Sequence, residues 1–147
     1  MNARRLLLLV ATPLAIASLA APAAAAVINV VKTASCGCCG KWVEHMKKAG
    51  HDVRVTNVED VTPTARRLGV PDDLRSCHTS SVGGYAIEGH VPAADIARLL
   101  REKPKAAGLS VPGMVAGSPG MEMGSNKPPY QIIIFTRDGK RKVFAQH

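Results

Sequence analysis

The chain has 147 residues, and its 19 Lys and Arg exceed its 11 Asp and Glu, which gives a formal net charge of +8 at pH 7. This length suits one small domain; 46% hydrophobic residues exclude a disordered chain, and a mean hydropathy of +0.05 excludes a multispan membrane protein. Aromatic residues make up only 3%. Rings therefore do not alternate with the basic residues as they do on surfaces that stack single-stranded nucleic acid, and we expect no nucleic-acid partner.

Residues 1–26 have the three parts of a cleavable secretory signal peptide. Arg4 and Arg5 precede a long apolar run, and the segment ends in small residues that include Ala24 and Ala26. A transmembrane anchor is the alternative, but prolines such as Pro13 interrupt the run. We expect cleavage after Ala26, export of the protein, and no membrane association of the mature chain.

Residues 27–104 have the pattern of a thioredoxin-like α/β domain. A β-branched strand at 27–32, a helix at 41–49 and an alternating strand at 52–56 predict a βαβ unit with a parallel strand pair. A short helix follows, with Thr62 as its N-cap, Pro63 at its first helical position and Gly69 at its end. A hairpin at 80–88 and a helix at 92–102 come next. The cysteines occupy the first turn of the βαβ unit, where thioredoxin-like domains carry C-x-x-C.

Residues 105–147 are interpreted as an extension packed on the same domain. Residues 105–130 are rich in Gly, Pro and Met and predict a long loop, and 130–135 with 142–145 predict a final hairpin. We interpret this hairpin as an added sheet edge. Alternatively, its strands are the third and fourth strands of the thioredoxin core, with Pro129 at the position of that fold's cis-proline.

Three of the four cysteines crowd into four positions, at Cys36, Cys38 and Cys39, and the fourth is Cys77. Four cysteines in an exported protein would by default form two structural disulfides. A bridge between adjacent Cys38 and Cys39 is strained, however, and such tight loops gain little stability from cross-linking. The spacing therefore indicates metal or redox chemistry.

Three thiolates at a helix N-terminus repel one another, and several monovalent cations bridged by shared sulfur would remove that repulsion best. Adjacent Cys38 and Cys39 cannot easily direct both sulfurs at one tetrahedral ion, so the pattern favours a polynuclear thiolate site over an isolated zinc ion. Cys77 would add a fourth sulfur opposite the turn, and the ligand role of His78 stays open. The remaining histidines are interpreted as solvated or capping residues: His45, His51, His90 and His147.

The methionines of the long loop are further candidate donors. Thioether sulfur selects Cu(I) and does not suit harder ions. Met114 and Met121 are therefore predicted ligands, with Met123 less clearly assigned, and packing is the alternative for all three. Met46, on the apolar stripe of the first helix, is predicted to be a core residue.

The sequence resembles the periplasmic CopG-type copper-resistance family, formerly a domain of unknown function. The resemblance rests on Ala34–Trp42 around the C-x-C-C, on Cys77-His78-Thr79, on 84–92, and on the loop at 111–122. It implies a thioredoxin-like domain with a C-terminal extension and a cysteine-bridged multinuclear copper site mapped onto Cys36, Cys38, Cys39 and Cys77. It also implies a role in copper redox handling and detoxification.

We therefore expect a monomeric periplasmic protein that binds copper for copper resistance, with Cu(I)/Cu(II) interconversion as one activity that such a cluster permits. A copper efflux or redox protein is an expected partner, and no separate catalytic or cofactor-binding residues are assigned. Two alternatives stay open. One is a thiol–disulfide oxidoreductase that uses Cys36 and Cys39, and the other is a copper metallochaperone without catalysis.

Overall fold

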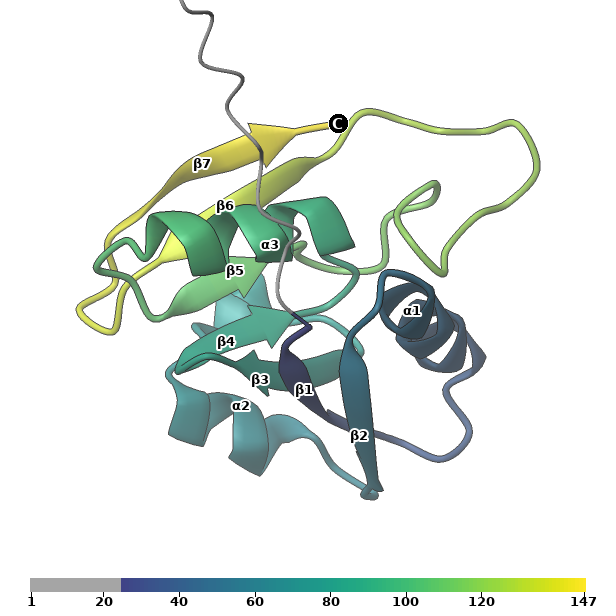
Figure 1. Cartoon of the computed structure of the whole chain (residues 1–147), viewed down its shortest axis with the longest axis horizontal. Helices are drawn as coiled ribbons and strands as arrows, with labels where there is room; N and C mark the ends of the chain where they lie inside the picture. Colours follow the sequence, from purple (N-terminus) through teal and green to yellow (C-terminus); the bar gives the residue numbers. More distant parts are fainter. Residues whose placement is uncertain (1–24) are drawn as a thin grey trace, which may run out of the picture.

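A computed structural model describes residues 25–147 of this chain. One seven-stranded mixed sheet carries three α-helices and a short 3-10 helix (Figure 1). The elements in chain order are β1 (Val27–Lys32), α1 (Gly37–Lys48), β2 (Asp52–Asn57), α2 (Thr62–Leu68), η1 (Asp72–Leu74), β3 (His78–Val82), β4 (Tyr85–Glu88), α3 (Ala93–Glu102), β5 (Gly108–Ser110), β6 (Gln131–Phe135) and β7 (Arg141–Gln146).

The strand order in the sheet is β2-β1-β3-β4-β5-β6-β7. The pairs β1–β2 and β4–β5 are parallel, and all other neighbouring pairs are antiparallel. The β3–β4 turn is made by Gly83 and Gly84, whose φ values of 55° and 87° suit glycine. The predicted βαβ unit and this hairpin are confirmed, and the hairpin begins two residues earlier than predicted.

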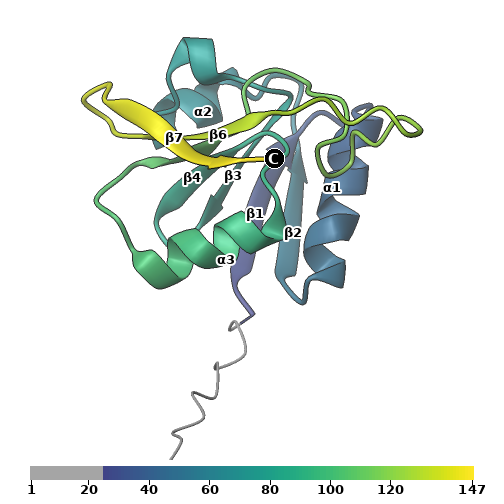
Figure 2. The same ribbon diagram turned by 90° about the horizontal axis from the view of Figure 1, so that it is seen from above.

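The two faces of the sheet carry separate apolar cores. α1 and α3 cover one face, where Trp42, Met46 and Ile96 are fully buried, which confirms Met46 as a core residue (Figure 2). α2 covers the other face, where Ala65 packs with Phe135 of β6. Each helix thus buries one stripe against the sheet, as expected for a two-sided α/β layer.

The C-terminal strands extend this sheet through β5. The alternative that placed 130–135 and 142–145 in the core is wrong, because β3 pairs directly with β1 while β6 and β7 lie beyond β5. The three residues of β5 were not predicted, since so short a buried run carries no readable period. Among residues 25–147, no helix is long and apolar enough to cross a membrane.

Two helix boundaries differ from the prediction. α1 begins at Gly37, four residues before the predicted start, so that Cys38 and Cys39 lie in its first turn and Cys36 is its N-cap. The first turn was missed because glycine and cysteine are poor helix formers. In α2, Thr62 is the first helical residue instead of the cap, and its backbone N–H is bonded by the side chain of Asp60.

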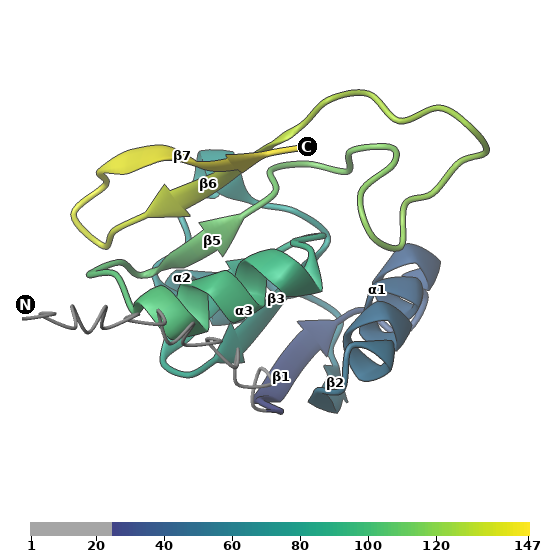
Figure 3. The ribbon, with the colours of Figure 1, turned by 45° about the horizontal axis from the view of Figure 1, so that its top comes forward.

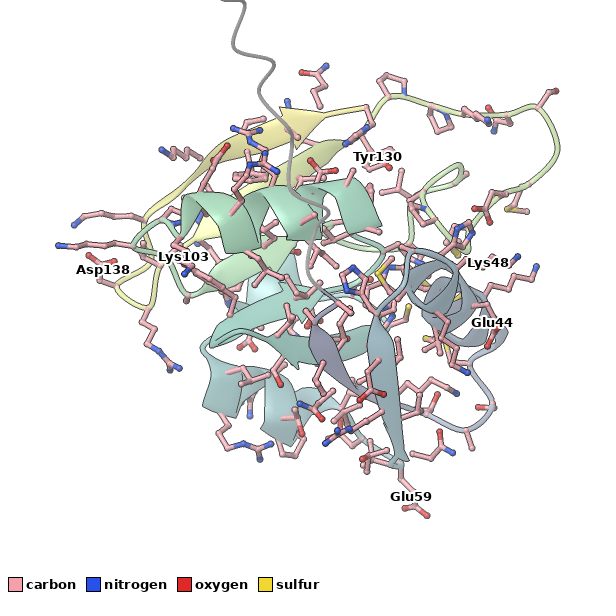
Figure 4. All side chains as sticks on the ribbon, viewed as in Figure 1. Glu44, Lys48, Glu59, Lys103, Tyr130 and Asp138 are labelled. Carbon is pink, nitrogen blue, oxygen red and sulfur yellow. A yellow bond between two sulfur atoms is a disulfide. The ribbon has the colours of Figure 1, made fainter. Side chains whose placement is uncertain are left out.

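The long loop between β5 and β6 reaches across to α1. Figures 1 and 3 both show it passing beyond the sheet and returning beside this helix. Glu44 and Lys48 lie on the side of α1 that faces solvent (Figure 4). The predicted signal peptide falls almost entirely on residues 1–24, which lie outside the described part of the chain.

Candidate functional site

The register of the sheet brings Cys77 to the cysteine turn. β1 and β3 run antiparallel, and His78 at the start of β3 is paired with Lys32 at the end of β1. The chain leaves β1 at Lys32 and reaches Cys36 four residues later, so the turn and Cys77 lie at the same end of these two strands. Segments 39 residues apart in sequence therefore meet, as the Cys38–Cys77 sulfur contact shows.

The four sulfur atoms form one cluster, all within 4.8 Å of one another. Cys36 and Cys39 are joined by a disulfide, whereas Cys38 and Cys77 are free. The Sγ–Sγ distances are 3.4 Å between Cys36 and Cys38, 3.5 Å between Cys39 and Cys77, and 3.9 Å between Cys38 and Cys77. The two free thiols are therefore in contact with the disulfide and with each other.

Two imidazoles extend this cluster on the side of Cys77. The Cys77 Sγ lies 3.1 Å from Nε2 of His90 and 3.5 Å from Nδ1 of His78. Both histidines are fully buried, and their rings meet edge to face with centroids 5.0 Å apart. The interpretation of His90 as a solvated or capping residue is wrong. Its side chain is held inside, because Nδ1 lies 2.8 Å from the Pro119 carbonyl oxygen.

The surroundings of His78, His90 and Cys77 favour the neutral forms of their side chains. Burial, together with the positive charges of His90 and Lys32, lowers the pKa of His78 to about 3. Burial also lowers the pKa of His90. Burial and the neighbouring Cys38 raise the pKa of Cys77 to about 11. Neutral imidazole is the form that binds metal, and a thiol must lose its proton to do so.

Among residues 25–147, one buried histidine nitrogen has no hydrogen-bond partner, namely Nε2 of His78. The ring of Trp42 packs against the same imidazole with centroids 4.6 Å apart, and the Trp42 indole N–H donates to the Val91 carbonyl oxygen at 2.9 Å. Buried polar atoms are normally paired. This unpaired nitrogen is therefore available to a ligand or water.

A buried carboxylate fixes the segment that carries Cys77. Glu88 accepts hydrogen bonds from the Arg75 guanidinium at 3.1 Å, the Ser76 backbone N–H at 2.8 Å and the Thr79 hydroxyl at 2.6 Å. Burial raises the pKa of Glu88, and these donors oppose that shift. The Ser76 hydroxyl in turn donates to the Gly113 carbonyl. Residues on both sides of Cys77 are thereby held in place.

The β5–β6 loop is seated on the N-terminal part of α1. An added Cβ on Gly120 would lie 2.7 Å from both the Cys38 carbonyl oxygen and the Trp42 backbone nitrogen, so the two backbones touch here. Glu122 forms an ion pair with His45 at 2.8 Å and accepts from the Gly120 N–H at 3.0 Å. The loop therefore covers the cysteine turn, and its Pro119 contacts His90.

The three methionines of this loop differ in how deeply their side chains are buried. Met121 follows Gly120 and is half-buried. Met114 is 58% exposed and Met123 is 65% exposed, so neither packs in the core. The structure thus brings together the four predicted cysteines and adds His78 and His90. It leaves the ligand role of Met114 and Met121 a prediction.

The donor set fits a soft metal ion. Thiolate sulfur and neutral imidazole suit copper, and sulfur in particular stabilises Cu(I), whereas no carboxylate belongs to either donor group of the described residues. Four sulfurs spread over 4.8 Å, together with two imidazoles on one side, offer more donors than one tetrahedral ion requires. The chemistry of these residues therefore matches copper as the bound ion.

Known proteins resemble this chain in sequence and structure. Residues 74–121 match a family model described as "Protein of unknown function, DUF411". Two solved structures, titled "Copper resistance protein copG", Form 2 and Form 1, align with TM-scores of 0.80 and 0.78 at 43% and 45% identity. The first alignment covers 84% of this chain and 99% of the other, and the second covers 82% and 96%. No curated protein matches this chain. The two structural matches show that this chain belongs to the family of the copper resistance protein CopG.

Proposed function

We propose that this protein binds several copper ions at Cys36, Cys38, Cys39 and Cys77 and thereby contributes to copper resistance. The observation that carries this proposal is the presence of four sulfur atoms within 4.8 Å of one another. When the Cys36–Cys39 disulfide is reduced, the four cysteines become closely spaced thiolates that repel one another, and Cu(I) ions that share sulfur ligands relieve the repulsion. The printed names of the two similar structures support the role in copper resistance.

His90 and His78 are proposed as additional donors. The His90 Nε2 is 3.1 Å from the Cys77 sulfur, close enough for one ion to bind both residues after a small adjustment. Loop methionines, of which Met121 and Met114 are the candidates, would complete the coordination from the covering side. A mixed sulfur and imidazole set tolerates both Cu(I) and Cu(II), which supports interconversion of the two states as an activity of the site.

The wider setting of the site is also proposed. The order β2-β1-β3-β4, with β1–β2 parallel and the next two pairs antiparallel, supports a thioredoxin-like domain at 27–104 with 105–147 as its extension. The protein is proposed to act in the periplasm as a monomer after cleavage following Ala26. Mass spectrometry of periplasmic material should find a chain that begins at Val27, and an intact Met1 would contradict the signal peptide.

A thiol–disulfide oxidoreductase is the second candidate, because Cys36 and Cys39 form a disulfide. Such an enzyme needs those two cysteines only. Cys38, which is the free cysteine of the same turn, has no role in that chemistry. It would be expected to matter only if metal is bound.

Cys38→Ser therefore distinguishes the two functions. A copper site should lose copper or change its absorption spectrum, whereas a dithiol oxidoreductase should keep its disulfide-reductase rate. Ser35→Ala is the matched control, because Ser35 is an exposed neighbour in the same turn. Metal analysis should find more than one copper per chain in the parent protein and in Ser35→Ala. Unchanged copper content and spectrum in Cys38→Ser would refute the copper proposal.

A further inference from the structure

Basic side chains gather around the turn between β6 and β7. Three adjoining hollows of about 340, 350 and 320 Å³ lie there, and Thr136 lines all three. Six basic residues each line at least one of these hollows, namely Arg66, Lys105, Arg137, Lys140, Arg141 and Lys142. These six residues form one continuous cationic surface, which is called the basic face below.

Carboxylates neutralise only part of the charge of the basic face. Three ion pairs involve its residues, namely Arg66–Asp72, Lys140–Asp138 and Arg141–Asp73. Within residues 25–147, the other three cations form no ion pair, and they are exposed: Lys105, Arg137 and Lys142. Six cations and three carboxylates leave this surface with a net positive charge that is available to a ligand.

The basic face lies at the opposite end of the sheet from the cysteine turn. β3 runs from His78, beside that turn, to Val82 at the far end. Strand pairing continues the far end across the sheet to Phe135 and Arg141, on either side of the β6–β7 turn. Figures 1, 2 and 3 show this turn and α1 on opposite sides of the molecule. Binding at the basic face therefore requires no contact with the cysteines.

Protection of a sheet edge explains only part of the basic face. β7 is an edge strand, because in the described part of the chain it pairs with β6 alone. Charged residues on edge strands help to prevent aggregation, and this role accounts for Arg141 and Lys142. It does not account for Arg66, Lys105 and Arg137, which come from three other segments and line the same hollows. Their convergence favours a binding surface.

We propose that the basic face binds an extended acidic segment of a partner protein. Carboxylates that follow one another along such a segment match cations that line adjoining hollows. The open edge of β7, which begins at Arg141, offers backbone hydrogen bonds to an extended chain, as in β-augmentation. This inference goes beyond the copper function and does not depend on it.

An anionic membrane fits the basic face less well than an acidic segment does. The cations line hollows, whereas a membrane presents a broad surface. Segments that lie on a membrane combine basic residues with an apolar face that enters the lipid. Val143 is the large exposed apolar residue of β7, with 49% of its surface exposed, and one such residue makes no apolar face.

The test measures binding of a fluorescently labelled oligoglutamate peptide to the mature chain by fluorescence anisotropy. The parent protein should bind the peptide at low ionic strength. Binding should weaken as salt is added, because exposed charges are screened over about 10 Å at 0.1 M ionic strength. Absence of peptide binding by the parent at low ionic strength would overturn the proposal.

A matched pair of double variants locates the binding surface. Lys105→Glu with Lys142→Glu reverses two charges of the basic face, and Lys48→Glu with Lys127→Glu makes the same change in net charge elsewhere. All four lysines are exposed and belong to none of the ion pairs of the described residues, so neither variant breaks one. The first variant should bind the peptide about tenfold more weakly than the second, as expected from the loss of a few exposed charge contacts. Equal binding by the two variants would show a general effect of net charge and would overturn the proposal.

Two further measurements distinguish the basic face from a membrane site and from the copper site. Binding of the parent to phosphatidylglycerol vesicles, without binding to the peptide, would replace the acidic segment by a membrane and reject the proposal. Both double variants should retain Cu(I) as the parent does, because the cysteines lie at the other end of the sheet. Loss of Cu(I) by the Lys105 and Lys142 variant alone would contradict the independence of the two ends. Failure of the parent itself to retain Cu(I) would reject the copper function and leave peptide binding as the test of the basic face.

Discussion

Gly120→Ala should detach the β5–β6 loop from α1 and uncover the cysteine turn. Gly120 has a φ of +87°, and an added Cβ would lie 2.7 Å from two backbone atoms of α1, the Cys38 oxygen and the Trp42 nitrogen. The left-handed conformation alone costs an alanine roughly 1–2 kcal/mol. The helix backbone cannot retreat without loss of its own hydrogen bonds, so the loop is the part that should move.

Gly124→Ala provides the matched control in the same loop. Gly124 also has a positive φ, of +62°, but an added Cβ would meet no atom within 4 Å. Both variants therefore carry backbone strain, and only Gly120→Ala carries the clash with α1. The difference between them isolates the effect of seating the loop on the cysteine turn.

The assay is the rate of alkylation of Cys38 and Cys77 in metal-free protein, together with retention of Cu(I) against a competing chelator. Gly120→Ala should be alkylated faster and should lose copper more readily than Gly124→Ala, and loss of the contact between Pro119 and His90 should contribute. Thermal unfolding should show a larger loss of stability for Gly120→Ala than for Gly124→Ala, because only Gly120→Ala adds the clash with α1 to the backbone strain. Equal alkylation rates and equal copper retention in the two variants would refute the covering role of the loop.

Two further substitution sets test the supports of the site. Glu88→Gln removes the charge that accepts three hydrogen bonds around Cys77, and urea unfolding should show a free energy of unfolding lower by about 1.5–3 kcal/mol. The control is Glu102→Gln, which breaks an exposed ion pair with Arg98 and should lower the free energy of unfolding by less than about 1 kcal/mol. A loss for Glu88→Gln no larger than that for Glu102→Gln would contradict the anchoring role. Replacement of Met114, Met121 and Met123 by Leu should change stability by less than about 1.5 kcal/mol and should speed both copper loss to a chelator and oxidation in air. Unchanged retention and air stability would assign these side chains to packing.

Much of the fold could be predicted because its signals are local. The β-branched run at 27–32, the Gly83-Gly84 turn and the apolar stripe of α3 each determine an element with little help from the rest of the chain. β5 could not be predicted, because residues 108–110 become a strand only through pairing with β4 and β6. The start of α1 was missed for a similar reason, since packing of the helix overrides weak propensities in its first turn.

The part of the site that depends on sequence spacing could be predicted, and the part that depends on tertiary contacts could not. Three cysteines in four positions marked the turn, and the β1–β3 register then brought Cys77 to it. His90 carried no comparable signal. Its role depends on the turn after β4, which places Nε2 of His90 beside the Cys77 sulfur. It also depends on Pro119 of a distant loop, whose carbonyl oxygen accepts a hydrogen bond from Nδ1 of His90. Only a tertiary contact distinguishes such a residue from a solvated histidine.

The arrangement of the cysteines bears directly on the choice between the two functions. A dithiol enzyme requires Cys36 and Cys39 to meet and requires access to them by another thiol. Here Cys39 is fully buried and Cys77 lies 3.5 Å from its sulfur, so an external thiol can reach the pair only through the half-buried Cys36. The same contact is useful for metal binding, since it places a third and a fourth sulfur beside the pair. Copper binding therefore accounts for all four cysteines and both histidines, whereas dithiol exchange accounts for two.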